Sequence, residues 1–557
     1  MRLYRLWATL SLLLLLITPC AIAKDRWTEL NLGPFYVTTD TDPAKAREAL
    51  TQLEQLRWVL GNILEAKDLP SLWPIRIMLT SKDGNPYPNP RFIRRGSQYL
   101  LVTSPRAAMP LGQVAGLLID ANTPRLPPEV ESGLIQLLST LEAHGSRVTW
   151  GGPPAHPDLA WARMQLFATK FQYSASFHIF VTALRGGSTL AAAERNAFGK
   201  SSSELESEAQ ANLAAGNWSP VPVSGRPLDP KRDFGEHMLA AVICDVYLGD
   251  WTLESKPTAA EAAYKAAIEA GGTAAPLGYE GLAEAAELRK EDAKVDWDNA
   301  VRAGSHSAPV YVAAGKGLPE TEAVPLLKRA GQLNDRWAEP VYLQAQLAPA
   351  PAEKESLLKA AIKLDPRATA YWVELAQLQT VAGEGTAAQG SWLRAEDSAP
   401  SDAERERVHQ LHIANEAQRL TAAEEAARRD RESVHIADAQ AQNSELARIH
   451  AAEQKANQAL EKEAGGDKPS GVVDWNSLAQ EKKLAGTLTR VDCLKKGWRL
   501  SVKDKSGNVT QLFLSSETNA SLSCGLQAHV VRVVLAYRSS IDDDIHTVGE
   551  INSLQIR

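Results

Sequence analysis

Residues 357–366 read LLKAAIKLDP, and this stretch decides the fold of the middle of the chain. Similar phrases occur upstream, as AYKAAI at 263–268, DNAV at 298–301 and PLLKRA at 325–330. Their spacing of about 30–34 residues is typical of stacked helical hairpins. One such hairpin cannot bury its apolar face alone, so the stacking of successive units supplies the core and leaves a concave surface.

The clearest unit ends in Leu364-Asp365-Pro366 and continues as AYWVELA at 370–376, and Pro400 follows Pro366 by 34 residues. This pattern resembles the tetratricopeptide repeat (TPR), whose unit is two helices of about 34 residues in all. The resemblance implies a TPR-like α-helical solenoid over residues 230–400 that binds a protein or peptide partner. An irregular helical domain is the alternative, because the earlier units match the pattern less well.

A second informative stretch lies upstream, where GQVAGLL at 112–118 is followed by RLPPEVESGL at 125–134. The pair resembles the peptidase-MA-like (gluzincin) family. In that family one helix carries H-E-x-x-H, and the next, with the pattern P-x-W-x-x-E-G-L, supplies a third zinc ligand. The surrounding pattern is kept at Ala115, Leu117, Leu118, Pro127, Gly133 and Leu134. The resemblance implies an α+β gluzincin-like domain over residues 26–225.

The zinc-binding positions of this pattern no longer carry zinc ligands. The first His falls on Gly112, the catalytic Glu on Gln113, the second His on Gly116 and the distal Glu on Ser132. Catalytic zinc needs about three protein ligands and a base that activates the bound water. Glycine, glutamine and serine supply neither, so we expect a degenerate domain with no catalytic residue, no metal and no cofactor.

Other residues near the helix pair keep hydrolase chemistry open as an alternative. Two carboxylates and a His can form a metal or acid–base site, and the candidates are Asp120, Glu129, Glu131 and His144. Asp120 lies four residues after Gly116 and so shares its helix face. The sequence H-E-x-x-H does not occur in the chain. The pair His409 and His412 stands in a densely charged stretch, which predicts a solvated helix face.

The rest of the first domain predicts alternating strands and helices. Apolar or β-branched runs at 35–39, 75–79 and 99–102 predict strands. Residues 43–64 carry leucines on one face, which predicts an amphipathic helix. Residues 198–218 resemble the closing helix of the same peptidase family.

The first 23 residues predict an export signal. Two arginines precede an apolar run at 10–17, and Ala21-Ile22-Ala23 provides a small-x-small cleavage site. Cys20 leaves lipidation open, although Pro19 stands where a lipobox has a small residue. The apolar run is shorter than the about 20 residues of a membrane span. We therefore expect no span after cleavage and an exported, periplasmic or extracellular protein.

Three cysteines remain after the predicted cleavage. Cys493 and Cys524 lie in one β-rich region, where a disulfide would close a loop of about 30 residues and stabilise the fold by roughly 3 kcal/mol. We expect this disulfide, because exported proteins meet an oxidising environment. Cys244 lies in the apolar stretch 238–247, which predicts a helix with a buried free thiol.

Residues 401–464 contain no Gly and no Pro and predict a long charged helix, about 96 Å long at about 1.5 Å per residue. Its apolar stripe is broken, so a solvated spacer and self-association as a coiled coil both stay open.

GGDKPSG at 465–471 predicts a linker. Five strand-like runs in 472–557 predict a small β-barrel, OB-like in kind. Asp542-Asp543-Asp544 predicts an exposed acidic turn, with cation binding as the alternative.

Composition limits the class of partner. A net charge of −7 over 557 residues argues against nucleic acid, because phosphate binding needs a basic surface. A chain of this length forms several domains. The leading hypothesis is an exported, non-catalytic scaffold that binds peptide or protein segments through the TPR-like repeats and the degenerate peptidase domain. An active hydrolase with non-standard residues and a structural envelope-assembly component are the alternatives.

Overall fold

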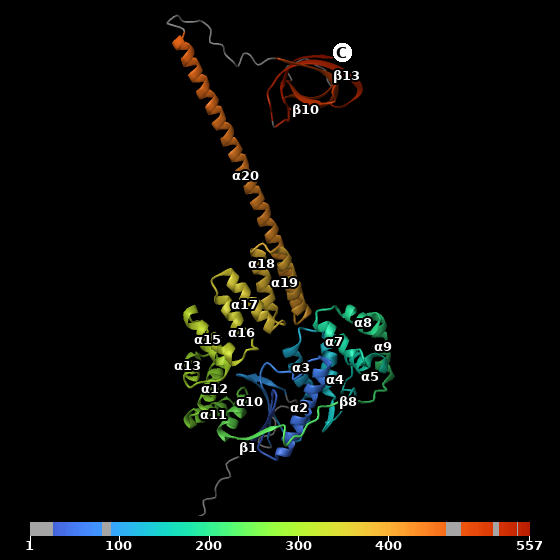
Figure 1. Cartoon of the computed structure of the whole chain (residues 1–557), viewed down its shortest axis with the longest axis vertical. Helices are drawn as coiled ribbons and strands as arrows, with labels where there is room; N and C mark the ends of the chain where they lie inside the picture. Colours follow the sequence, from blue (N-terminus) through green and yellow to red (C-terminus); the bar gives the residue numbers. More distant parts are fainter. Residues whose placement is uncertain (1–25, 81–90, 464–480, 516–522, 543, 557) are drawn as a thin grey trace, which may run out of the picture. The chain divides into compact units, whose positions relative to one another are not determined.

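The computed structural model describes residues 26–80, 91–463, 481–515, 523–542 and 544–556 (Figure 1). Two compact units divide the chain, Met1–Arg429 and Asp430–Arg557, and each is described by itself. The predicted signal peptide with Cys20 and the predicted linker lie outside the described residues. Among the described helices, none is long and apolar enough to cross a bilayer.

A six-stranded sheet organises the beginning of the first unit. Its strand order is β4-β5-β3-β2-β1-β9. The parallel pairs are β2 with β3 and β3 with β5, and the other neighbours are antiparallel. The predicted strands at 35–39, 75–79 and 99–102 are confirmed. The strands are β1 (Trp27–Leu32), β2 (Phe35–Thr39), β3 (Ile75–Leu79), β4 (Ile93–Arg95), β5 (Gln98–Thr103) and β9 (Gly235–Leu239).

The edge strand β9 differs from the sequence prediction. Residues 238–247 were expected to be helical, but Met238 and Leu239 pair with β1, and helix α10 begins only at Ala241. Backbone hydrogen bonds to a strand far away in the sequence determine an edge strand, and local patterns do not show them. β9 lies inside residues 230–400, the range that the sequence assigned to the repeats.

Helices α2 to α9 and a small antiparallel sheet complete the α/β part. The predicted helix at 43–64 is confirmed as α2, which buries Leu50, Leu53, Leu56 and Leu60 in the core. The small sheet has the order β6-β7-β8. The elements are α2 (Pro43–Ile63), α3 (Leu111–Asn122), α4 (Pro128–Ser139), β6 (Glu142–His144), β7 (Arg147–Trp150), α5 (Leu159–Thr169), α6 (Phe171–Ser174), α7 (Phe177–Arg185), α8 (Leu190–Phe198), α9 (Ser202–Ala215) and β8 (Val221–Ser224).

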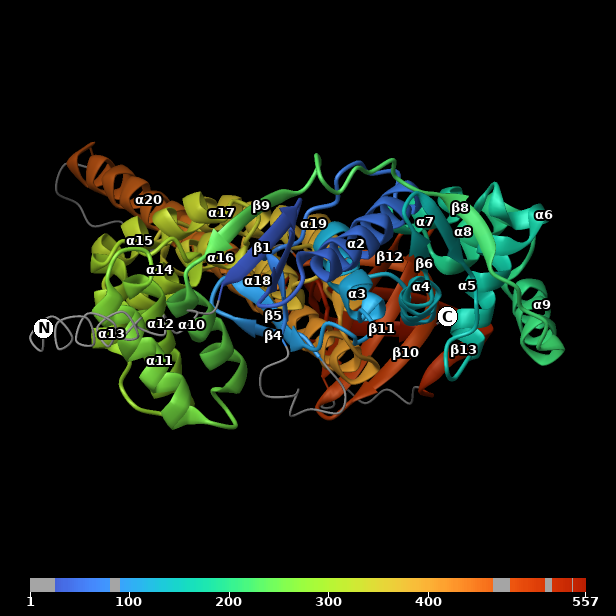
Figure 2. The same ribbon diagram turned by 90° about the horizontal axis from the view of Figure 1, so that it is seen from below.

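Helices α10 to α19 form a solenoid in which each helix packs against the next. The four recurring phrases of the sequence fall on alternate helices, α11, α13, α15 and α17, which confirms the predicted repeat of paired helices. Figure 2 shows α10 beside the β4–β5 side of the sheet, where it contacts β5. The helices are α10 (Ala241–Thr252), α11 (Pro257–Ala270), α12 (Ala275–Leu288), α13 (Lys294–Arg302), α14 (Ala308–Gly315), α15 (Glu320–Leu333), α16 (Glu339–Leu347), α17 (Pro351–Leu364), α18 (Thr369–Val381) and α19 (Gly385–Ser398).

The long charged helix is α20 (Asp402–Glu463), with 62 residues. Its second turn is anchored, since Val408 is buried in a cluster with Trp392 and Ala395 of α19. Beyond that contact even the apolar side chains are exposed, among them Leu420, Val434 and Leu446. A helix with this pattern gains its stability from local hydrogen bonds and i,i+3 or i,i+4 ion pairs rather than from a core.

The second unit contains a five-stranded sheet whose strand order closes on itself as β10-β11-β12-β14-β13. The closure between β12 and β14 is parallel and rests on the pair Phe513↔Glu550, and the other neighbours are antiparallel. Alternate residues such as Leu512 and Leu514 point into its core. The strands are β10 (Lys482–Leu494), β11 (Gly497–Asp504), β12 (Val509–Ser515), β13 (Gly525–Arg538) and β14 (Glu550–Ile556).

The cysteines are arranged as the sequence predicted. Cys493 at the end of β10 is bonded to Cys524, which precedes β13, with 5.7 Å between their Cα atoms. Cys244 is free and buried, and burial raises the pKa of its thiol to about 12. A thiol in that state is a poor nucleophile.

We expect the C493S/C524S double variant to lose roughly 3 kcal/mol of stability in the β module. The disulfide closes a loop between positions 31 residues apart, which restricts the unfolded chain. Hydrogen exchange of the β10–β14 amides in the full chain would measure the loss. Faster exchange confined to this module is the expected result, and unchanged exchange would contradict it.

The acidic turn at 542–544 is described in part, because residue 543 lies outside the described residues. The Asp542 carboxylate accepts hydrogen bonds from the backbone N–H groups of Asp544 and Ile545, at 3.1 and 3.4 Å. Asp542 also forms an isolated bridge with Thr547. These bonds close a turn, as the exposed-turn interpretation requires.

Candidate functional site

The α3–α4 helix pair shows what surrounds the positions that the resemblance aligns with zinc ligands. Gly112 and Gly116 lie on the face of α3 that packs against α4. A Cβ atom at Gly112 would lie 3.1 Å from Ser139 Cβ, and one at Gly116 would lie 3.6 Å from Ile135 Cδ1. The two helices therefore approach closely, and the Ile135 side chain fills the space next to positions where the resembled family carries imidazoles.

The other two positions of the resembled site also have structural partners. Gln113 Oε1 accepts a hydrogen bond of 2.9 Å from the Phe92 backbone N–H. Ser132 is exposed, and its Oγ accepts from Gln136 Nε2 at 3.1 Å. Each of the four positions thus serves local packing or hydrogen bonding. The resemblance to the peptidase family itself stays a prediction.

The solenoid places an arginine beside this helix pair. Arg367, in the loop between α17 and α18, is buried, with 7% of its side chain exposed. Its guanidinium donates to Asp120, to both carboxylate oxygens of Glu131 at 2.8 and 3.2 Å, and to the backbone oxygen of Thr123 at 2.9 Å. Bidentate pairs of this kind are among the stronger hydrogen-bonded contacts in proteins.

This network bears on the alternative hydrolase site. Asp120 and Glu131 lie close together, but both carboxylates form ion pairs with the Arg367 guanidinium. His144 lies in β6, in the separate three-stranded sheet, and Glu129 lies in the first turn of α4. The arrangement fits a contact between the α/β part and the solenoid better than an acid–base site.

Further polar contacts join the same surfaces. Arg125 Nε donates to the Ser398 backbone oxygen at 2.8 Å, and Asn334 Nδ2 donates to that of Leu72 at 2.9 Å. Arg336 donates to the Ala121 backbone oxygen at 3.0 Å. Between them lies a largely polar cavity of about 660 Å³. The loops of the repeats are therefore held against the C-terminal end of α3.

An apolar groove of about 680 Å³ lies between repeat helices α12 to α16 and the β4–β5 hairpin. Its apolar lining includes Trp297, Val312, Leu327, Trp337 and Leu343. Val312 and Leu343 are half-buried and so retain area that a ligand could cover. A concave, mostly apolar surface with few polar groups is the usual form of a ligand site.

The walls of the groove are held in place by aromatic and polar contacts. The Trp297 indole N–H donates to Glu287 at 3.0 Å. Trp337 meets Trp73 of the α/β part edge to face, with ring centroids 5.1 Å apart. The Arg94 guanidinium lies over the Trp73 ring, 5.1 Å from its centroid. A fixed wall lowers the entropy cost of binding a ligand.

Buried carboxyl groups of α10 and α12 lie where the solenoid meets the β4–β5 hairpin. Burial, and then repulsion by Glu284, raises the pKa of Asp250 and of Glu280 to about 8. Tyr264 donates to Asp250 at 3.0 Å, and Ser307 donates to Glu280 at 2.6 Å. The raised pKa favours the uncharged form of both carboxyl groups, which lowers the cost of burying them.

The hairpin turn fits closely over these carboxyl groups. Gly96, with φ of +48°, donates its N–H to Glu284 at 2.7 Å. A Cβ atom at this position would collide with the Glu280 carboxylate. Both the backbone conformation and the close approach favour glycine at this position.

Sequence reasoning did not find Arg367, the groove or the buried carboxyl groups. Arg367 directly follows the Leu-Asp-Pro phrase, but a charged residue in a loop carries no local sign of burial. Trp297 stands in the charged helical stretch KVDWDNAV and Trp337 in the loop stretch NDRWAEP, and neither context marks a shared surface. Their shared surface arises from stacking of helices that are separated in the sequence.

Comparisons with known proteins give no family for the chain. No family model matches it, and no curated protein is similar. Among solved structures, YrrB, described as a TPR protein with an unusual peptide-binding site, is 20% identical, with coverage of 30% of this chain and 90% of that one and a TM-score of 0.26. Pseudomonas aeruginosa pilF is 18% identical, with 32% and 88% coverage and a TM-score of 0.27. Yeast Tom70 is 14% identical, with 56% and 70% coverage and a TM-score of 0.27.

Proposed function

We propose that this chain is a non-catalytic scaffold that binds an extended peptide or protein segment in the solenoid groove. The observation that carries the proposal is the apolar groove of about 680 Å³ with half-buried Val312 and Leu343 in its lining. A helical solenoid offers such a concave surface because its units stack in one direction. We expect the ligand to be a segment with one or two large apolar side chains that enter the groove.

The absence of catalysis is part of the same proposal. Close packing of Gly112 and Gly116 against α4, together with the exposed Ser132, supports a pseudo-peptidase domain. The engagement of Asp120 and Glu131 by Arg367 weakens the alternative of a hydrolase with non-standard residues. The α/β part then acts as a support that closes one side of the groove through its β4–β5 hairpin.

Export to a periplasmic or extracellular location remains part of the proposal, supported by the signal-like first 23 residues and by the Cys493–Cys524 disulfide. The strand order β10-β11-β12-β14-β13, with its parallel closing pair, supports an OB-like barrel for the C-terminal module. The exposed apolar residues of α20 keep self-association and a role in envelope assembly open as a second candidate function.

We expect Val312→Asp to weaken binding of groove-selected peptides at least about tenfold. The variant replaces an apolar groove contact by a carboxylate that an apolar ligand must cover, and desolvating it costs more than the about 1.4 kcal/mol that corresponds to a factor of ten. Panning a random-peptide library against the full chain would supply the peptides, and calorimetry would measure their affinities. The bound peptides should also be recovered uncut.

Val381→Asp is the matched control, because Val381 lies on α18 of the same solenoid with 86% of its surface exposed. That variant should bind like the wild type. Equal affinity of the two variants would contradict the groove as the binding site. A library that yields no apolar-anchored peptide would favour the assembly role, and cleavage of bound peptides would favour the hydrolase.

A further inference from the structure

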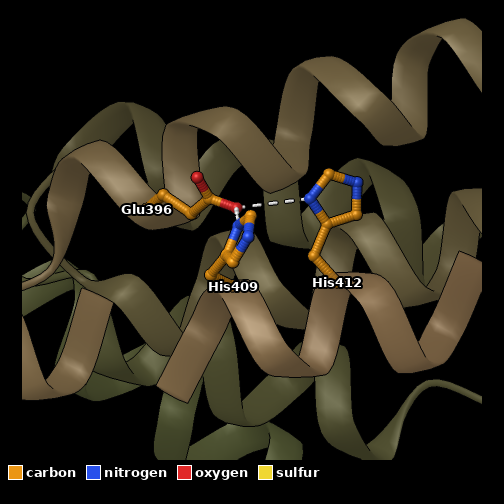
Figure 3. Close-up of side chains that lie close together, drawn as sticks. All are labelled: Glu396, His409 and His412. Carbon is orange, nitrogen blue, oxygen red and sulfur yellow. Dashed lines mark hydrogen bonds and ion pairs between the residues drawn. The ribbon is translucent and has the colours of Figure 1, made fainter. Parts of the chain in front are cut away.

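Three side chains with metal-binding atoms come together where α20 meets the last repeat helix (Figure 3). Glu396 lies on α19, and His409 and His412 lie on α20. Among the described residues, this is the group of at least three His, Cys, Asp or Glu side chains whose ligand atoms lie close enough to share an ion. The two histidines are three residues apart, which places them on one helix face.

The structure corrects the sequence interpretation for His412, whereas His409 is exposed as expected. The charged context predicted a solvated face, but His412 is only 23% exposed, and its ring stacks on Trp392 with 5.3 Å between centroids and 7° between planes. His409 is 49% exposed. The packing of the first turns of α20 on α19 is a tertiary contact, and charge density along one helix does not reveal it.

Two of the three distances between the ligand atoms suit a small divalent cation, and all three atoms lie within 4.8 Å of one another. Glu396 Oε1 lies 3.1 Å from His409 Nδ1 and 3.2 Å from His412 Nδ1. Around zinc, at about 2.0–2.2 Å from nitrogen and oxygen ligands, the ligand atoms of a tetrahedron stand about 3.4 Å apart. Without a cation, the same carboxylate oxygen accepts both Nδ1–H bonds. In the tautomer that carries its proton on Nε2, each Nδ1 instead presents a lone pair toward the same point.

The three donors are also held in place before any ion binds. Glu396 is 18% exposed, and the neighbouring Trp392, Ala395 and Val408 form the apolar contact that fixes α19 against α20. Ring stacking restricts rotation of His412. Because the His409 side chain is about half exposed, water molecules can reach the site and would complete the coordination. A site whose ligands sit on rigid helices needs little reorganisation to bind.

We propose that Glu396, His409 and His412 bind a zinc-class divalent ion that fastens the start of α20 to α19. Imidazole nitrogens with one carboxylate suit Zn²⁺ and its transition-metal neighbours, whereas Mg²⁺ and Ca²⁺ prefer oxygen ligands. The site is separate from the Gly112–Gly116 face of α3 and does not depend on the proposed peptide groove. The ion holds the last helical hairpin together.

A zinc titration of the untagged, chelator-treated full chain, in competition with a chromophoric chelator, tests the proposal. The wild type should bind one Zn²⁺ per chain through this site. H409A, H412A and E396Q should each weaken that binding by more than about 100-fold, since loss of even an outer-shell partner costs about 10–100-fold. His435→Ala and Glu424→Gln, at exposed positions of α20, are matched controls that should keep wild-type affinity.

The outcomes separate a metal site from a hydrogen-bonded triad. Co²⁺ should give a visible spectrum with the wild type and with H435A but not with H412A. Circular dichroism checks that each variant is folded, and H409A, which removes a half-exposed ring, guards against misfolding as the cause of lost binding. Zinc binding that is equal in all variants, or no competition at micromolar free zinc, would overturn the proposal.

Discussion

Replacing Gly133 by Ala is expected to destabilise the α/β part by about 2–3 kcal/mol, although alanine favours a helix. Gly133 lies in α4 where this helix crosses α5. A Cβ atom there would collide with the Ala160 backbone oxygen and would lie 2.6 Å from Met164 Cγ. A backbone oxygen inside a helix cannot move aside without shifting α5 as a whole.

The measurement is the midpoint of thermal unfolding together with hydrogen exchange in α4 and α5. For a domain of this size, the loss corresponds to a fall of roughly 4–12 °C. Gly116→Ala is the matched control on the neighbouring helix, because its Cβ would meet Ile135 at an ordinary 3.6 Å. That variant should gain up to about 1 kcal/mol from helix propensity. Equal stability of the two variants would contradict the packing argument.

The sequence pattern marked Gly133 without explaining it. The position belongs to the stretch that resembles the second peptidase helix. The sequence alone shows that its glycine matches this pattern, but not why a glycine stands there. The structure supplies the reason, which is the crossing with α5. The residues that a local pattern determines, such as the recurring phrases on α11, α13, α15 and α17, were placed correctly because helical repeats depend on neighbours in the sequence.

Features that depend on distant parts of the chain were not predictable in this way. β9 pairs with β1, Arg367 meets Asp120 and Glu131, and Glu396 reaches the two histidines of α20. Each pairing joins segments that lie far apart in the sequence or on separate elements. A buried arginine, a glutamate at a helix end and a pair of histidines all look like solvated residues when only their neighbours are considered. Burial and charge pairing decide their roles, and both appear only after the elements have packed.

Arg367→Met is expected to destabilise the contact between the solenoid and the α/β part by about 3 kcal/mol. Removing one partner of a buried ion pair costs about 3–5 kcal/mol, because the remaining charge is left without compensation. Glu131, which is 19% exposed, then lacks its cation, whereas Asp120, which is 59% exposed, is rehydrated and lowers the cost. Methionine keeps the length and most of the volume of the side chain, so the lost charge dominates the effect.

Urea unfolding and hydrogen exchange at the end of α3 and in the α17–α18 loop would measure this change. Arg429→Met is the matched control, since Arg429 is 74% exposed and forms an i,i+4 pair with Glu425. Exposed pairs of that kind contribute at most about 0.5 kcal/mol. The double variant R367M/E131Q should lose less stability than the two single variants lose in sum, because the neutral glutamine no longer needs a cation. Strict additivity would show that Arg367 and Glu131 are not coupled, and Arg367 would then act through its bonds to Asp120 and to the Thr123 backbone oxygen.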